Sequence, residues 1–155
     1  MAEKHFTSEE NFKEFMRDVQ RVAALLLLPT REIENVDLNG DGQIDGFQFE
    51  LGNPLYTAQP LSSIKGFSLI VNGERIDPEK ITFILRRNRI SLKNVSTIPE
   101  LWWGYGEIIR VFIEKPGGLK SGEYQVECSL VMTPAFYPFY PENTVLSAST
   151  IMRVK

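Results

Sequence analysis

The spacing of hydrophobic residues changes once along the chain, from the spacing of a helix to that of β-strands. Between residues 12 and 26, apolar side chains recur at helical spacing and charged residues occupy the other face. The apolar positions are Phe12, Phe15, Met16, Val19, Val22, Ala23 and Leu26. Thr7-Ser8-Glu9-Glu10 has the form of a capping box, so a helix is predicted to begin there, and Pro29 should stop it near Leu28. A buried strand over residues 24–28 is the alternative, because a short apolar run has no decisive period.

From Ile33 onward, short alternating runs are separated by Gly, Pro, Asn and Asp, which is typical of all-β domains. Strands are predicted over residues 44–51 with a bulge near Gly46, and over 67–71, 81–85, 90–92, 107–114, 124–132 and 144–154. Asn72-Gly73 is a strong hairpin signal. Residues 134–141, rich in Pro and aromatics, cannot form a central strand.

The spacing Leu119-x-x-Gly122-x-Tyr124 resembles the tyrosine corner of immunoglobulin-like sandwiches. We therefore predict a mostly β fold: an antiparallel β-sandwich, immunoglobulin-like or jelly-roll-like, with a short N-terminal helix. Residues 1–30 would form the helical extension and residues 31–155 the sandwich domain.

Composition narrows the classes of partner. A length of 155 residues suits one domain, and the net charge of -3 is spread along the chain, so neither nucleic-acid binding nor a basic membrane patch is indicated. The apolar run at residues 22–28 is too short to cross a bilayer, and the acidic first ten residues do not resemble an export signal. With a single cysteine, the chain is expected to be cytoplasmic.

Residues with catalytic chemistry are scarce. His5 is the only histidine and lies in the N-terminal tail, while Cys128 falls on the apolar face of a predicted strand. The carboxylates on predicted strands, such as Glu107 and Glu114, form no evident acid/base pair. We therefore predict no catalytic residue in this chain and no cofactor bound to it.

One loop has the spacing of a calcium site. Residues 37–45 match the first nine positions of an EF-hand-type loop, with Gly42 at the sharp turn. The possible ligands are Asp37, Asn39, Asp41, Gln43 and Asp45. Position twelve, however, is Gln48 where a bidentate Glu is normal. A β-hairpin whose turn uses the two glycines is therefore favoured over a calcium site.

Two aromatic-rich segments lie in predicted loops. Such side chains are common anchors of protein interfaces and of planar or sugar ligands, although burial in the core accounts for some of them. The interface or substrate-pocket candidates are Tyr56, Trp102, Trp103, Tyr105, Phe136, Tyr137, Phe139 and Tyr140.

The order of several short motifs resembles the small β subunit of bacterial C-glycoside deglycosidases, over roughly residues 33–133. The motifs are Asp45-Gly46-Phe47-Gln48-Phe49, Pro54-Leu55-Tyr56, Pro60-Leu61-Ser62, Gly66-Phe67, Val71-Asn72-Gly73-Glu74-Arg75-Ile76 and Lys115-Pro116-Gly117-Gly118-Leu119-x-x-Gly122. The chain departs from the family at residues 50–56, where relatives tend to carry an Arg and paired tyrosines.

The resemblance implies a β-sandwich subunit bound to a TIM-barrel α subunit in a hetero-oligomer. That partner would hold the catalytic residues and a divalent metal such as manganese. It would cleave the C–C bond of 3-oxo-C-glycosides, for example those of flavonoid C-glucosides. This chain would stabilise the α subunit and help form its substrate pocket. The alternatives are a stand-alone carbohydrate-binding or calcium-dependent β-sandwich module, and a purely structural scaffold.

Overall fold

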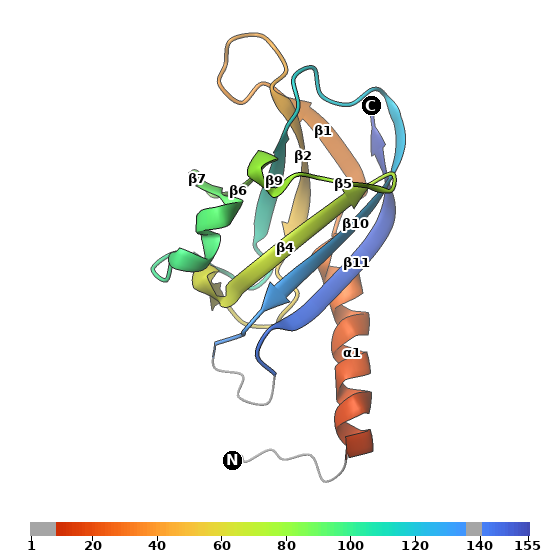
Figure 1. The fold of residues 1–155 in the computed structure, drawn as a ribbon, viewed down its shortest axis with the longest axis vertical. Coiled ribbons are helices and arrows are strands. Elements are labelled where there is room, and N and C mark those ends of the chain that lie inside the picture. The colour runs from red at the N-terminus through yellow and green to blue at the C-terminus, as the bar shows by residue number, and fades with distance from the viewer. Residues whose placement is uncertain (1–8, 136–140) are drawn as a thin grey trace.

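The computed structural model describes residues 9–135 and 141–155, which form one helix followed by a large curled sheet (Figure 1). The helix is α1 (Glu9–Leu27). The strands are β1 (Glu32–Val36), β2 (Gly46–Gly52), β3 (Gln59–Pro60), β4 (Ile64–Val71), β5 (Glu74–Arg75), β6 (Ile81–Leu85), β7 (Asn88–Ser91), β8 (Trp102–Trp103), β9 (Ile108–Glu114), β10 (Gly122–Met132) and β11 (Thr144–Val154). Three 3-10 turns, η1 (Leu61–Ser63), η2 (Pro78–Lys80) and η3 (Leu92–Thr97), connect some of these strands.

The predicted helix is present, and it ends at Leu27, two residues before Pro29. The alternative of a strand over residues 24–28 is wrong, because the helical hydrogen bonding continues through that apolar run. The capping residues Thr7 and Ser8 lie outside the described residues. The C-terminal part of α1 packs on the sheet through the buried Ala23 and Leu27, while its N-terminal turns extend beyond the sheet (Figure 1).

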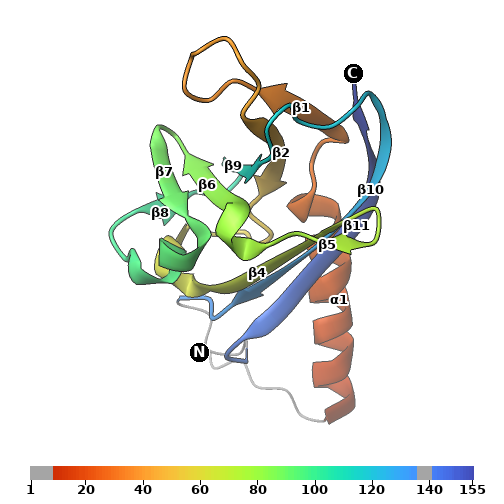
Figure 2. The ribbon, with the colours of Figure 1, turned by 45° about the horizontal axis from the view of Figure 1, so that its top comes forward.

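The nine-stranded sheet has the order β5-β4-β10-β11-β1-β2-β9-β6-β7 and curls so that its two halves face each other (Figure 2). Strand β1 joins the halves. Its first residues pair with β11 (Glu32 with Arg153), and its last pair with β2 (Asn35 with Phe47). The mostly β fold is confirmed. One pair departs from the predicted antiparallel pairing, because β1 runs parallel to β11.

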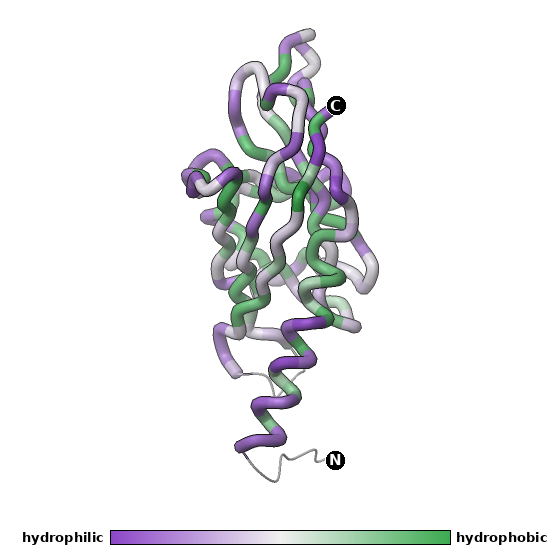
Figure 3. The backbone as a smooth tube through the Cα atoms, turned by 90° about the vertical axis from the view of Figure 1, so that its right-hand side faces the viewer, coloured by the Kyte–Doolittle hydropathy of each residue, from purple (hydrophilic) through white to green (hydrophobic). Residues whose placement is uncertain are grey.

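The core lies between the two halves of the sheet. Alternate residues of β10 from Val126 to Met132 are buried there, as the period of two predicts. Phe67 of β4 meets Phe83 of β6 edge-on across the core, with ring centroids 5.2 Å apart. Apolar residues accordingly line the interior while polar ones follow the connecting loops (Figure 3). Tyr124 donates its hydroxyl to the Lys120 carbonyl at 2.8 Å, which is the back-bond of the predicted tyrosine corner.

The predicted turns have the expected backbone. Asn72 and Gly73 take φ values of 50° and 78°, so they form the type I′ hairpin turn between β4 and β5. Gly118, with φ of 70°, sits so close to Asn35 that a Cβ would lie 2.3 Å from Asn35 Oδ1. The Asn35 amide and the backbone of Leu119 then exchange two hydrogen bonds of 2.9 Å each, which fasten this turn to β1.

No helix among the described residues has the length and apolar character needed to cross a membrane.

Gly52 provides a test of how the helix docks. A Cβ on Gly52 would lie 2.3 Å from the Leu26 carbonyl oxygen of α1, so the helix and β2 must separate to admit it. We expect Gly52→Ala to lower the free energy of unfolding by about 2 kcal/mol in urea denaturation. Gly66→Ala is the matched control, because its Cβ would meet only ordinary contacts beginning at 3.6 Å. Equal stability of the two variants would contradict close docking of α1 on β2.

Candidate functional site

Asn53 is buried and holds two loops together at the end of β2. Its side-chain Nδ2 donates to the carbonyls of Thr57, Trp103 and Gly104 at 3.1–3.2 Å. Its Oδ1 accepts the backbone N–H of Leu55 at 2.8 Å. Asn53 is only 4% exposed, so both ends of its amide must be satisfied within the protein. One side chain therefore sets the position of the loop at residues 53–58 relative to the loop at residues 103–107.

Arg86 fastens the second loop from its other side. It lies in the turn between β6 and β7 with φ of 57°, and its guanidinium forms an ion pair with Glu107 and donates to the Trp102 carbonyl at 3.0 Å. Glu107 also accepts the backbone N–H of Gly104 at 2.8 Å. This hairpin tip is thus not only a solvated turn. A second arginine of the hairpin, Arg89 on β7, donates to the Leu38 carbonyl at 3.1 Å.

Gln59 anchors a third segment nearby. It is fully buried, donates to the Ala135 carbonyl at 3.1 Å, and accepts from the Ala135 backbone N–H and the Ser63 hydroxyl. The backbone of Gln59 pairs with Trp103 in the short β3–β8 ladder. The start of the Pro-rich segment is therefore tied to the same end of the sheet. Neither Asn53 nor Gln59 was predicted from the sequence as a site residue. The only signal in the sequence is that each is a polar amide beside residues that are otherwise apolar.

These three side chains fix the position of an exposed aromatic patch, which we define as Tyr56, Trp102 and Tyr105. The two tyrosine side chains are each 65% exposed, and their ring centroids are 6.0 Å apart. Trp102 is 39% exposed. The structure thus brings together two of the predicted interface candidates, Tyr56 and Tyr105, from loops far apart in the sequence, and Trp102 lies three residues before Tyr105.

The remaining aromatic candidates have different positions. Trp103 is fully buried, and its indole N–H donates to the Glu107 carbonyl at 2.8 Å. It was predicted as an interface candidate, but in this chain it is a core residue. Neighbouring residues of a strand point to opposite faces, which is why Trp102 and Trp103 differ. Phe136, Tyr137, Phe139 and Tyr140 lie outside the described residues.

The calcium-like loop connects β1 to β2 and is a hairpin connection, as favoured from the sequence. Gly40 and Gly42 take the positive φ values of 78° and 87°. The loop also brings carboxylate oxygens of Asp37, Asp41 and Asp45 within 4.8 Å of one another. Three hard-cation ligands therefore converge in the same loop that forms the hairpin. Gln48, at loop position twelve, lies on β2 and donates to Glu34 at 3.0 Å instead.

Asp37 organises this loop through its carboxylate. It accepts the backbone N–H groups of Gly40, Asp41 and Gly42 at 2.9, 3.2 and 2.6 Å. Desolvation raises the pKa of Asp37, but the hydrogen bonds from Gly42, Gly40 and Asp41 outweigh it and leave the pKa below its usual value. The side chain is therefore ionised near neutral pH, as a cation ligand must be.

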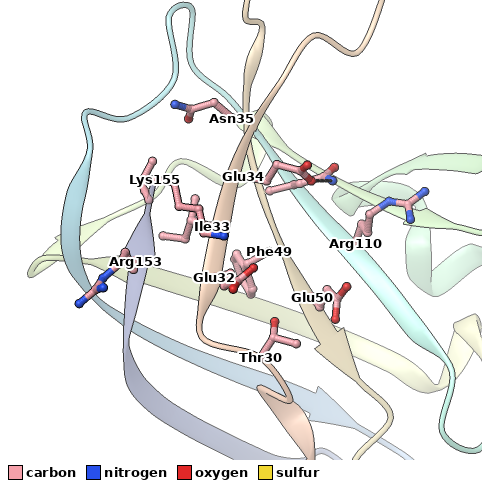
Figure 4. Close-up of a pocket in the computed structure, with 12 residues that line it drawn as sticks. Thr30, Glu32, Ile33, Glu34, Asn35, Phe49, Glu50, Arg110, Arg153 and Lys155 are labelled. Atoms are coloured by element: carbon pink, nitrogen blue, oxygen red, sulfur yellow. Dashed lines mark hydrogen bonds between the residues drawn. The ribbon is translucent and has the colours of Figure 1, made fainter.

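Two open hollows on the outer face of the sheet offer no evident reaction centre. One, of about 500 Å³, lies along β1 and is lined by carboxylates such as Glu32 and Glu50 together with Arg110 and Arg153 (Figure 4). Arg153 points away from Glu50 and Arg110 in Figure 4 and pairs with Glu123 at 3.0 Å. The second hollow, also about 500 Å³, is lined by the four arginines Arg86, Arg87, Arg89 and Arg110.

Cys128 has the position predicted for it, in the core. Burial raises the pKa of its thiol to about 12, so the group stays protonated and is a poor nucleophile.

Comparison with known proteins identifies the family. The model of the family described as "C-glycoside deglycosidase beta subunit" matches residues 26–136. The chain belongs to this family. A relative of that name from Eubacterium cellulosolvens (strain ATCC 43171 / JCM 9499 / 6) is 27% identical over 100 residues, which cover 64% of this chain and 68% of the relative. The region shared with the C-glycoside deglycosidase beta subunit family includes Asn53, Gln59, Arg86 and the aromatic patch. It excludes most of α1 and all of β11.

Asn53 carries the prediction that tests this site. In Asn53→Asp, a carboxylate oxygen replaces the donor that faces three carbonyl oxygens in a buried position. We expect the free energy of unfolding at pH 7 to fall by about 3 kcal/mol in chemical denaturation, since the buried carboxylate would face three carbonyl oxygens and keep only the Leu55 N–H as a donor. The control is Asn88→Asp, whose exposed amide donates only to the Leu85 carbonyl and should cost well under about 1 kcal/mol. Similar losses in the two variants would contradict the role assigned to Asn53.

Proposed function

We propose that this chain is the non-catalytic β subunit of a C-glycoside deglycosidase, a lyase that cleaves the C–C bond of 3-oxo-C-glycosides such as those derived from flavonoid C-glucosides. Its role is to stabilise a TIM-barrel α subunit in a cytoplasmic hetero-oligomer and to help form the substrate pocket of that subunit. The observation that carries the proposal is the family match over residues 26–136, which spans most of the curled sheet.

The proposed reaction is a β-elimination that needs a base, an acid and a divalent metal. A 3-oxo group acidifies the proton at C2, so a base can remove that proton and the electron pair can form the C1=C2 bond as the C1–aglycone bond breaks. The aglycone carbon leaves with the bonding pair and takes a proton from an acid. A divalent metal such as manganese on the α subunit would stabilise the developing enolate oxygen.

Among the described residues, Cys128 and Glu107 are poorly suited to those steps, which supports placing the steps on the partner. The Cys128 thiol is buried with its pKa raised to about 12. Glu107, beside the aromatic patch, is occupied by Arg86 and by the Gly104 N–H. The single histidine of the sequence, His5, lies outside the described residues.

The proposal is tested by expressing the two subunits separately and together. We expect the purified chain to show no turnover of a 3-oxo-C-glycoside, and to co-elute with the α subunit of the same enzyme in size-exclusion chromatography. The mixed subunits should release the free aglycone, measured by liquid chromatography. The α subunit alone, at equal concentration, is the control and should have lower activity or a lower melting temperature. Turnover by this chain alone would overturn the proposal.

A second candidate function is a stand-alone carbohydrate-binding module that depends on calcium. The observation that favours it is the convergence of the Asp37, Asp41 and Asp45 carboxylates within 4.8 Å in a loop of EF-hand-like spacing.

A melting scan separates this candidate from the first. Calcium bound only by the folded state must raise the melting temperature, because ligand binding stabilises the native protein by mass action. The module predicts a rise of several degrees at millimolar calcium, reversed by chelator and absent in Asp37→Asn. It also predicts glycan binding without a partner. A melting temperature unaffected by calcium and chelator would remove this candidate.

A further inference from the structure

We propose that the aromatic patch formed by Tyr56, Trp102 and Tyr105 is the surface on which the α subunit docks, and that Asn53 is the residue that positions it. This inference rests on the proposed function, because it needs a partner subunit. It adds the place of contact and the residue that shapes it.

The patch is exposed, and the backbone of its loops is held by buried and ion-paired side chains. Tyr56 and Tyr105 are each 65% exposed, while the adjacent Leu55 is 2% exposed and Trp103 is fully buried. Asn53 donates to three loop carbonyls, and Arg86 binds Glu107 and the Trp102 carbonyl. Loops whose backbone is held in this way lose little backbone freedom on association, so more of the burial of their side chains contributes to affinity.

The aromatic patch lies in the region that the family model matches. The other exposed large apolar side chains of the described residues are Leu25 on α1, Ile44 in the loop before β2, and Val145 and Ile151 on β11. Leu25, Val145 and Ile151 lie outside residues 26–136, whereas the aromatic patch and the less exposed Ile44, at 36%, lie inside that range. Among its described residues, the matched region therefore offers these rings as its most exposed apolar surface for a partner of the family.

The side chains of the patch have the chemistry of an interface. Tyrosine and tryptophan are the residue types most enriched in the energetic centres of interfaces, and each has an apolar ring with a polar atom. The Arg86–Glu107 ion pair lies next to these rings, as the polar border of an interface does. The fitting occupant is a folded partner with an apolar pocket and hydrogen-bond acceptors for two phenol groups.

The test measures the dissociation constant of the α subunit from purified variants of this chain by titration calorimetry. Tyr56→Ala/Tyr105→Ala removes both exposed rings and should weaken binding by about 30-fold or more. Val145→Ala/Ile151→Ala is the matched control, since it removes two side chains of 48% and 50% exposure from β11. Binding of the control should change by less than about 3-fold.

The outcomes separate the two proposals. If the wild-type chain does not bind the α subunit, both are overturned. If it binds but the tyrosine double variant binds equally well, or the β11 variant is the weaker one, the docking surface is wrong and the proposed function stands.

Hydrogen exchange of the wild-type protein gives a readout that needs no variant to fold. Backbone amides of residues 53–58 and 103–107 should exchange more slowly when the α subunit is bound, while the exposed face of α1 is unchanged. Unchanged exchange in those two loops would overturn the docking surface.

The positioning role of Asn53 is tested by a second variant. Asn53→Gln keeps the amide N–H donor but moves it by one methylene group away from the three carbonyls. It should weaken α-subunit binding by about 10-fold or more even at temperatures where it is fully folded. Wild-type affinity would refute its positioning role.

Discussion

The fold depends on the position of β1 between the two halves of the sheet. Its first residues bond to β11, its last bond to β2, and the Asn35 amide bonds to Leu119 in the turn before β10. Without β1, the two halves would each have an unpaired edge, and the core between them would lose its closed side. The loops that carry the aromatic patch follow β2 and precede β9, which belong to the half of the sheet that β1 joins to β11.

The regular elements of the fold follow from local patterns in the sequence. The helix and the long strands β4, β10 and β11 were predictable, because each buries one periodic face against the core. The Asn-Gly turn after β4 was equally readable. The parallel pairing of β1 with β11 was not, since the hydrogen bonds link Glu32 to Arg153 and nothing local to either residue specifies its partner.

At the candidate site, residue type alone does not predict which side chains are exposed and which are buried. Trp102 and Trp103 are identical and adjacent, yet one is partly exposed and the other fully buried, because a two-residue strand sends them to opposite faces. Asn53 and Gln59 have only a weak signal in the sequence, a polar amide beside apolar residues, and the hydrogen bonds of the fold show that their amides organise three loops. For residues 37–45, the hairpin and the calcium site were posed as alternatives, but the loop has features of both: it connects paired strands and also gathers three carboxylates.

The bond between the first and last strands also bears on the order of events during synthesis. Ile33 pairs with Val154, so the seam of the sheet cannot form until the ribosome has released almost all of this sequence. Contacts so distant in sequence make folding slow, and the edges of β1 and β10 that β11 covers stay open to other chains in the meantime. The nascent protein is therefore exposed to aggregation until β11 has paired, and a partner that recognises the closed sheet can select only completed molecules.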